Sequence, residues 1–202
     1  MPILGNHDKE IRDRGTKYPE ITPYDIDATA FCDFFELPDE EWKWSFGIPD
    51  FNVTFMALDL QHLTDFGTTW QTCHDFHRGS EQFEWYKKIM NSDPQSFAIT
   101  LHNAKNDRIR AKEDGEWSNL FQKGTAAITG YGYFSERAEV NGFPYFNTSL
   151  KSGDIYPDKF SKVLEDIHGY ILLTFEKDKP MKLEIKSLDG EVIDSTVWSK
   201  RI

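Results

Sequence analysis

FNVTFMALDL (residues 51–60) is the clearest strand in the sequence, because aromatic and β-branched residues fill it and a carboxylate, Asp59, ends it. SEQFEWYKKIMNS (80–92) follows with apolar residues on one helical face. SFAITLHN (96–103) is a second apolar strand, and it delivers His102 at its end. Strand, helix and strand in this order predict a mixed α/β fold whose polar strand ends converge on one crevice.

Further strands and helices are predicted on both sides of residues 51–103. Residues 9–50 are polar and aromatic and predict a long ordered loop, with a short helix at 29–35 and a strand through Trp42, Trp44 and Phe46. Further elements are expected in the second half: a helix at 116–123, a strand and loop at 125–134 (TAAITGYGYF), and mainly antiparallel strands over 142–202. With no internal repeat, 1–202 is predicted to be a single domain.

Composition limits the classes of function. The chain has 202 residues, of which 39% are hydrophobic and 15% aromatic, so it can bury a sizeable core. Its net charge of −11 argues against sequence-independent nucleic-acid binding, which requires Lys and Arg on phosphates. No run approaches the ~20 apolar residues of a membrane span, and no signal peptide precedes the loop at the N-terminus. Two cysteines, Cys32 and Cys73, are expected to be reduced thiols in a cytoplasmic protein.

Three strand ends carry candidate ligands. Asn6 and His102 offer a carbonyl oxygen and an imidazole nitrogen, which suit a divalent metal ion. His7 could protonate a leaving group or steady a phosphoryl oxygen. The third candidate is the tyrosine-containing loop at 130–133. On spacing alone two structural alternatives remain open: residues of this kind also form turns, and a histidine at a strand end is often only a hydrogen-bonded structural residue.

A second histidine-rich stretch, CHDFH (73–77), packs a thiol, two imidazoles and a carboxylate into five residues. A polar surface loop is the favoured interpretation, because no second ligand cluster accompanies it.

The order of motifs resembles the calcineurin-like metallophosphoesterases. The stretches that carry the resemblance are PILGNHD, FNVTFMALD, EQFEWYKKIM, FAITLHN and ITGYGYFSERAEVNGFPYFNTS, which together span almost the whole chain. The family has a GNHD loop, a strand ending in Asp, a helix, a strand ending in a ligand His, and then a GHxH loop, in that order.

The resemblance implies a fold and a chemistry. The fold is an αββα sandwich, two packed sheets with helices outside. The chemistry is phosphoester hydrolysis by a metal-bound water between two divalent ions such as Mn, Fe or Zn, which clamp the attacking and leaving oxygens. By resemblance Asn6 and His102 bind metal and His7 acts on the phosphate. Asp8 supports the loop without binding metal.

Two departures from the family pattern weaken the catalytic expectation. The family's D-x-H and G-D motifs, which supply further metal ligands, come before GNHD, where this chain has no room for them. GHxH is replaced by GYGY, so Tyr131 and Tyr133 stand where imidazoles are expected. A phenol binds a metal only when deprotonated, from an ordinary pKa of ~10. Two ligands do not hold a dinuclear centre, so this chain alone is expected to hydrolyse phosphoesters weakly or not at all.

A partner is also expected, because the strands that precede GNHD in the family are central to a sheet and their absence leaves edges open. A second chain or oligomer, the aromatic segment at 20–50, or a longer parent protein could cover them. Two functions therefore remain: a metal-dependent phosphoesterase when completed by the missing motifs, and a catalytically inactive pseudo-phosphoesterase that acts as a binding or structural subunit.

Overall fold

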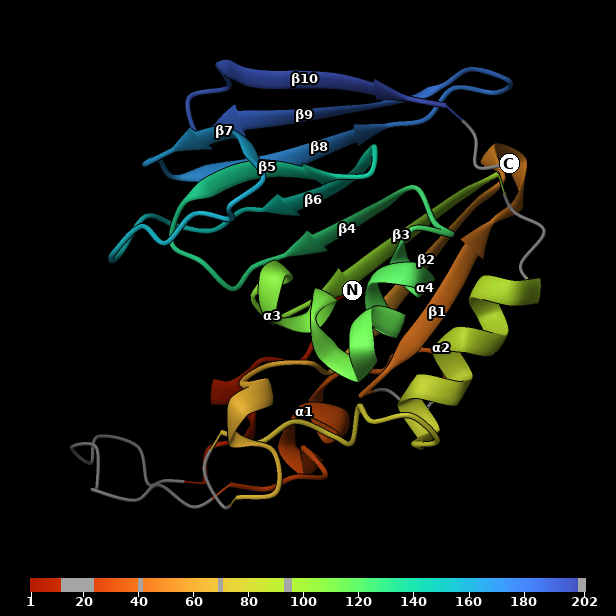
Figure 1. Cartoon of the computed structure of the whole chain (residues 1–202), viewed down its shortest axis with the longest axis vertical. Coiled ribbons are helices and arrows are strands. Elements are labelled where there is room, and N and C mark those ends of the chain that lie inside the picture. The colour runs from red at the N-terminus through yellow and green to blue at the C-terminus, as the bar shows by residue number, and fades with distance from the viewer. Residues whose placement is uncertain (12–23, 40–41, 69–70, 93–95, 200–202) are drawn as a thin grey trace.

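The computed structural model describes residues 1–11, 24–39, 42–68, 71–92 and 96–199. Two β-sheets form its centre, and Figure 1 shows the helices gathered beside one of them. The predicted loop at 9–50 lies partly outside the described residues.

The first sheet has seven strands in the order β1-β2-β3-β4-β6-β5-β7. Their bounds are β1 Trp44–Ile48, β2 Val53–Leu58, β3 Phe97–His102, β4 Ala126–Thr129, β5 Ser135–Val140, β6 Phe143–Asn147 and β7 Ser161–Glu165. Strands β2, β3, β4 and β6 run parallel to one another, and β1, β5 and β7 join the sheet by antiparallel pairing. The carboxyl ends of the four parallel strands therefore lie along one edge, as predicted.

The second sheet is a three-stranded antiparallel meander in the order β10-β9-β8. Its strands are β8 Gly169–Thr174, β9 Met181–Ser187 and β10 Val192–Trp198. The predicted mixed α/β fold with two packed sheets is confirmed.

Helices cover the face of the first sheet that is turned away from the second sheet. The α-helices are α1 Thr29–Phe34, α2 Glu81–Ser92, α3 Asn106–Arg110 and α4 Glu116–Phe121. Short 3₁₀ helices are η1 Asn6–Lys9, η2 Pro49–Phe51, η3 Leu63–Asp65 and η4 Lys112–Gly115. Helix α2 begins where predicted, because the Ser80 hydroxyl accepts the Phe83 N–H at 3.3 Å and caps the first turn.

The alternation of side chains along β3 explains the two cores. Ala98 packs with the helices, whereas Phe97 and Ile99 pack with the second sheet. The helix-side core contains Met56, Phe83, Tyr86, Trp117 and Phe121, and the core between the sheets contains Val53, Ile99, Phe146, Leu183 and Ile185. Each of these ten side chains is fully buried, and burying one stabilises the fold by about 1.5–3 kcal/mol.

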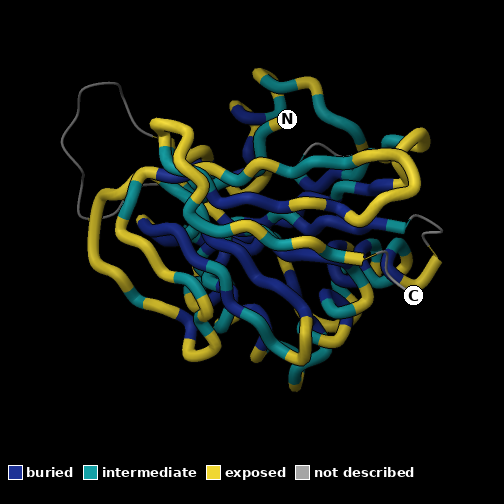
Figure 2. Tube along the Cα trace, turned by 90° about the horizontal axis from the view of Figure 1, so that it is seen from above, coloured by how far each residue is buried: buried dark blue, intermediate teal, exposed yellow. Residues whose placement is uncertain are grey.

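Most predicted elements are present, and three were missed. The strands β5 and β7 and the helix α3 had no strong pattern, since β5 (SERAEV) and β7 (SKVLE) are rich in charged residues. Figure 2 shows buried stretches of chain running through the interior, with exposed residues concentrated in the loops around the outside. No helix in the described ranges is both long and apolar enough to cross a membrane.

Candidate functional site

The candidate site lies at the carboxyl ends of the parallel strands. Strands β2, β3, β4 and β6 end at Leu58, His102, Thr129 and Asn147. The loops that follow these strands, together with the GNHDK segment, carry the residues that the sequence singled out.

The GNHD segment rests against the end of β3. It forms the 3₁₀ helix η1, in which the Gly5 N–H donates to Asp8 Oδ2 at 2.8 Å. Gly5 is packed so closely that a Cβ there would lie 3.2 Å from the Asn103 amide nitrogen. Asn6 is half-buried, and His7 is exposed with its Nδ1 2.5 Å from Glu10 Oε1.

Lys9, the residue directly after GNHD, fixes this segment to the end of β2. Its Nζ lies 2.6 Å from Asp59 Oδ2 and donates to the Thr72 carbonyl at 3.3 Å. The same carboxylate oxygen accepts the His74 backbone N–H at 3.0 Å, and His74 Nδ1 lies 2.6 Å from it. The sequence predicts Asp59 as a strand-end carboxylate. It predicts no role for Lys9, because a lysine is normally an exposed residue.

His74 belongs to the CHDFH stretch, which is only partly the polar surface loop expected. Cys73 and Phe76 are buried, and the His74 ring stacks on Trp42 with centroids 3.8 Å apart. Cys32 and Cys73 are both free thiols. Burial raises the pKa of the Cys73 thiol far above its ordinary value, so this thiol is unreactive.

His102 points into the helix-side core. It is completely buried, and its ring stacks on Phe121 at 5.7 Å between centroids with an interplanar angle of 11°. Its Nδ1 accepts the Ala104 N–H at 3.2 Å. Burial lowers the pKa of this imidazole to about 4, so it is neutral at pH 7.

The described donors do not fit a divalent metal ion. Because Nδ1 of His102 accepts the Ala104 N–H, the proton of the neutral ring is assigned to Nε2, which is buried without a hydrogen-bond partner among the described residues. In this tautomer neither ring nitrogen offers a free lone pair to a metal ion. Among the residues that the structure describes, no group of three or more His, Cys, Asp or Glu side chains could hold a metal. The assignment of Asn6 and His102 as metal ligands, and of His7 as catalytic, stays a prediction.

The GYGY loop is held by the side chain of Asn147. The Gly132 N–H donates to Asn147 Oδ1 at 2.8 Å, and Asn147 Nδ2 donates to the Gly132 and Phe134 carbonyls at 3.0 and 2.5 Å. A Cβ at Gly132 would lie 2.6 Å from the Phe134 ring. The two tyrosines of the loop differ in burial: Tyr131 is half-buried, whereas Tyr133 is 44% exposed.

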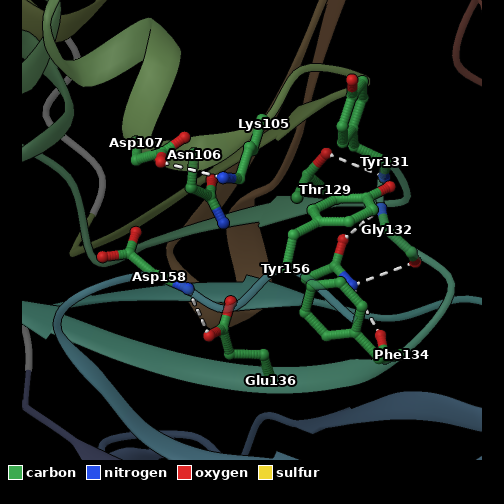
Figure 3. A pocket seen from close by; sticks show the side chains of 11 residues that line it. Lys105, Asn106, Asp107, Thr129, Tyr131, Gly132, Phe134, Glu136, Tyr156 and Asp158 are labelled. Carbon is green, nitrogen blue, oxygen red and sulfur yellow. Dashed lines mark hydrogen bonds and ion pairs between the residues drawn. The ribbon is translucent and has the colours of Figure 1, made fainter. Parts of the chain in front are cut away.

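A small polar pocket lies beneath Tyr131 (Figure 3). Lys105 contributes an ammonium group 3.0 Å from Asp107 and 5.4 Å from the centre of the Tyr156 ring. The central space of about 10 Å³ holds roughly one water molecule. The pocket therefore suits a water or a small polar group and is too small for a drug-sized ligand.

The buried carboxylates of Glu136 and Asp158 line this pocket, and Arg110 pairs with Asp158. Arg110 Nη2 donates to Asp158 Oδ2 at 2.6 Å, and the Asp158 N–H donates to Glu136 Oε1 at 2.8 Å. Burial raises the pKa of the Glu136 carboxyl above its ordinary value. These residues could not be predicted from the sequence, because they are far apart in the chain and two of them lie in α3 and β5, which were missed.

Comparison with known proteins supports a fold and no family. No sequence family matches the chain, and no curated protein matches it. Among solved structures, purple acid phosphatase PPD1 from yellow lupin seeds has a TM-score of 0.65 at 19% identity, over 98% of this chain and 40% of that one. GAP50, described as the anchor in the inner membrane complex of Plasmodium, has a TM-score of 0.54 at 11% identity, over 80% of this chain and 55% of that one.

The chain thus spans 40% and 55% of the lengths of these two proteins. At such identities the likeness concerns the fold alone. The fold of the chain is similar to that of part of a purple acid phosphatase.

Proposed function

We propose that this chain is a phosphoesterase-like domain that acts as a binding or structural subunit rather than as a metal-dependent hydrolase. The observation that carries the proposal is the placement of His102. Its ring is buried against Phe121, and its Nδ1 is used by the Ala104 N–H. The imidazole that the family pattern assigns to a metal is thus packed into the helix-side core.

The replaced GHxH loop agrees with this proposal. Asn147 holds the loop with three hydrogen bonds, and the two phenols that replace imidazoles differ in burial, Tyr133 being the exposed one. With an ordinary pKa near ~10, a phenol is a poor ligand at neutral pH. GAP50, which shares the fold, is described as an anchor, so the fold also occurs in a protein with a structural role.

Metal-dependent phosphoester hydrolysis is the second candidate. The contact of Gly5 with Asn103 favours it, because this contact brings the GNHD segment to the end of β3. The similarity of the fold to a purple acid phosphatase supports it as well. Ligands from outside the described residues would then have to complete a Mn, Fe or Zn site.

Metal analysis distinguishes the two functions. The purified chain is dialysed against Mn²⁺, Fe²⁺ or Zn²⁺, and bound metal is measured beside hydrolysis of p-nitrophenyl phosphate. We expect no metal above that of the His102→Gln variant and no activity above background. About two metals per chain, with activity that is lost in His102→Gln and Asn6→Ala, would establish the hydrolase and refute the binding role.

A further inference from the structure

The free edge of β8 is an unusual surface for this chain. Among the described residues strand β8 pairs with no strand other than β9, and it forms one edge of the second sheet. At the start of this edge the Gly169 N–H donates to the Ser149 carbonyl at 3.4 Å. From Gly169 to Phe175 the sequence is GYILLTF, which contains no charge and no proline although the chain as a whole has a net charge of −11. An edge of this kind presents unpaired backbone groups and attracts another strand.

The other three sheet edges are protected by devices that prevent such pairing. Strand β10 has an irregular register between Val192 and Asp194, and the Asp194 carboxylate is used by Arg137 of the other sheet at 2.6 Å. Strand β7 carries charged residues and pairs irregularly with β5. Strand β1 ends at Ile48, directly before a proline, Pro49. Of the four edges in the described residues, only β8 lacks a charge, a bulge and an adjacent proline.

The packing next to β8 is also incomplete. Ile171 and Leu173 pack into the core between the sheets but remain only partly buried, whereas Leu183 and Ile185 on the neighbouring strand β9 are 0% exposed. On the outer face Tyr170 and Leu172 are 39% and 40% exposed. One additional strand beside β8 would therefore satisfy the edge backbone and cover apolar side chains of the existing core.

We propose that the free edge of β8 binds an extended, uncharged segment of another polypeptide, flanked by basic residues, which pairs as a fourth strand of the second sheet. A second copy of this chain is disfavoured as the occupant because it would bring another net charge of −11 to the contact. A strand with Lys or Arg at its ends meets an acidic molecule with favourable electrostatics. This proposal specifies the partner of the binding subunit proposed above, and it rests on that proposed function.

A synthetic peptide of alternating valine and threonine, with two lysines at each end, is the probe. Hydrogen exchange of the chain is followed by mass spectrometry with and without this peptide. We expect exchange over 169–175 to slow by about tenfold or more, whereas 192–198 in β10 stays unchanged. The same peptide with glutamates in place of the lysines should protect β8 several-fold less.

Two variants with the same change of charge sharpen the test. Leu172→Lys places a cation at the edge and should weaken peptide binding at least several-fold. Val197→Lys, on β10 at a position that is 64% exposed, should bind like the unmodified chain. Circular dichroism of each variant checks that it is folded.

Three results would overturn the inference. The first is no protection by either peptide, and the second is protection over β10 instead of β8. The third is a dimer of the chain alone whose β8 amides are already protected and which Leu172→Lys makes monomeric, since the occupant would then be a second copy. Peptide binding and metal content are measured separately. A chain that binds both metal and the peptide would therefore contradict the proposed function and leave the β8 proposal standing.

Discussion

The ammonium group of Lys9 lies 2.6 Å from the Asp59 carboxylate, and both side chains are 0% exposed. This ion pair joins the segment after Gly5 to the end of β2. A buried charge that loses its partner is strongly destabilising, because the desolvation of the remaining ion is no longer compensated.

Replacing Lys9 by methionine should therefore lower the free energy of unfolding by about 3–5 kcal/mol. Urea unfolding followed by circular dichroism at pH 7 measures the change. The matched control is Lys88→Met, at an exposed lysine of α2, which should shift stability by less than about 0.5 kcal/mol. Equal effects of the two substitutions would contradict the role of the buried pair.

His102 should make the stability of the protein depend on pH. Burial lowers the pKa of this imidazole from 6.5 to about 4, so the unfolded chain takes up the proton first as the pH falls. The stability that neutral His102 contributes is complete above about pH 6.5 and is lost as the pH falls through 4. The free energy of unfolding should fall by about 3 kcal/mol in total over this range. Urea unfolding at a series of pH values should show this slope, and His102→Gln should reduce it.

The control for this prediction is His77→Gln. His77 is exposed, and its Nδ1 lies 2.8 Å from Asp75 at the surface. This variant should keep the full loss of stability between pH 6.5 and 4. A slope that survives in His102→Gln would assign it to another group.

Asn147 should order the GYGY loop. Asn147→Ala removes three hydrogen bonds to Gly132 and Phe134 and leaves their backbone groups without these partners in a buried site. We expect unfolding to become easier by about 2–4 kcal/mol and amides of 130–134 to exchange faster. Thr148→Ala, one residue further on, is the control. A loop with unchanged exchange in Asn147→Ala would mean that other contacts hold it.

Glu136 should make stability depend on pH in the direction opposite to His102. Its carboxyl has a raised pKa because it is buried, with the Asp158 charge nearby as a smaller cause. Stability is therefore highest below the ordinary pKa of the carboxyl and falls as the pH rises through the raised value. Glu136→Gln, which keeps an oxygen for the Asp158 N–H, should remove this fall. Glu139→Gln, on the same strand and more exposed, should keep it.

Much of the fold was predictable because it depends on local pattern. The strands β2 and β3 and the helix α2 are continuous apolar or amphipathic stretches, and each lies within two residues of its predicted bounds. Strand β7 was missed because its charged residues obscure the apolar pattern of a strand. Strand β5 was missed because its charged residues serve distant parts of the chain, such as Arg137 with Asp194. No local window contains that information.

The sequence by itself determined the strongly patterned strands and helices, the polar residues that end the parallel strands, and the resemblance to a phosphoesterase. Each of these depends on residue type and spacing within a short segment. Only the tertiary structure decided where those polar side chains point: His102 faces Phe121, Lys9 meets Asp59 across 50 residues, and Asn147 holds the loop at Gly132. Side-chain direction at a strand end depends on packing from distant segments, and a buried polar group must take the partners that this packing brings to it.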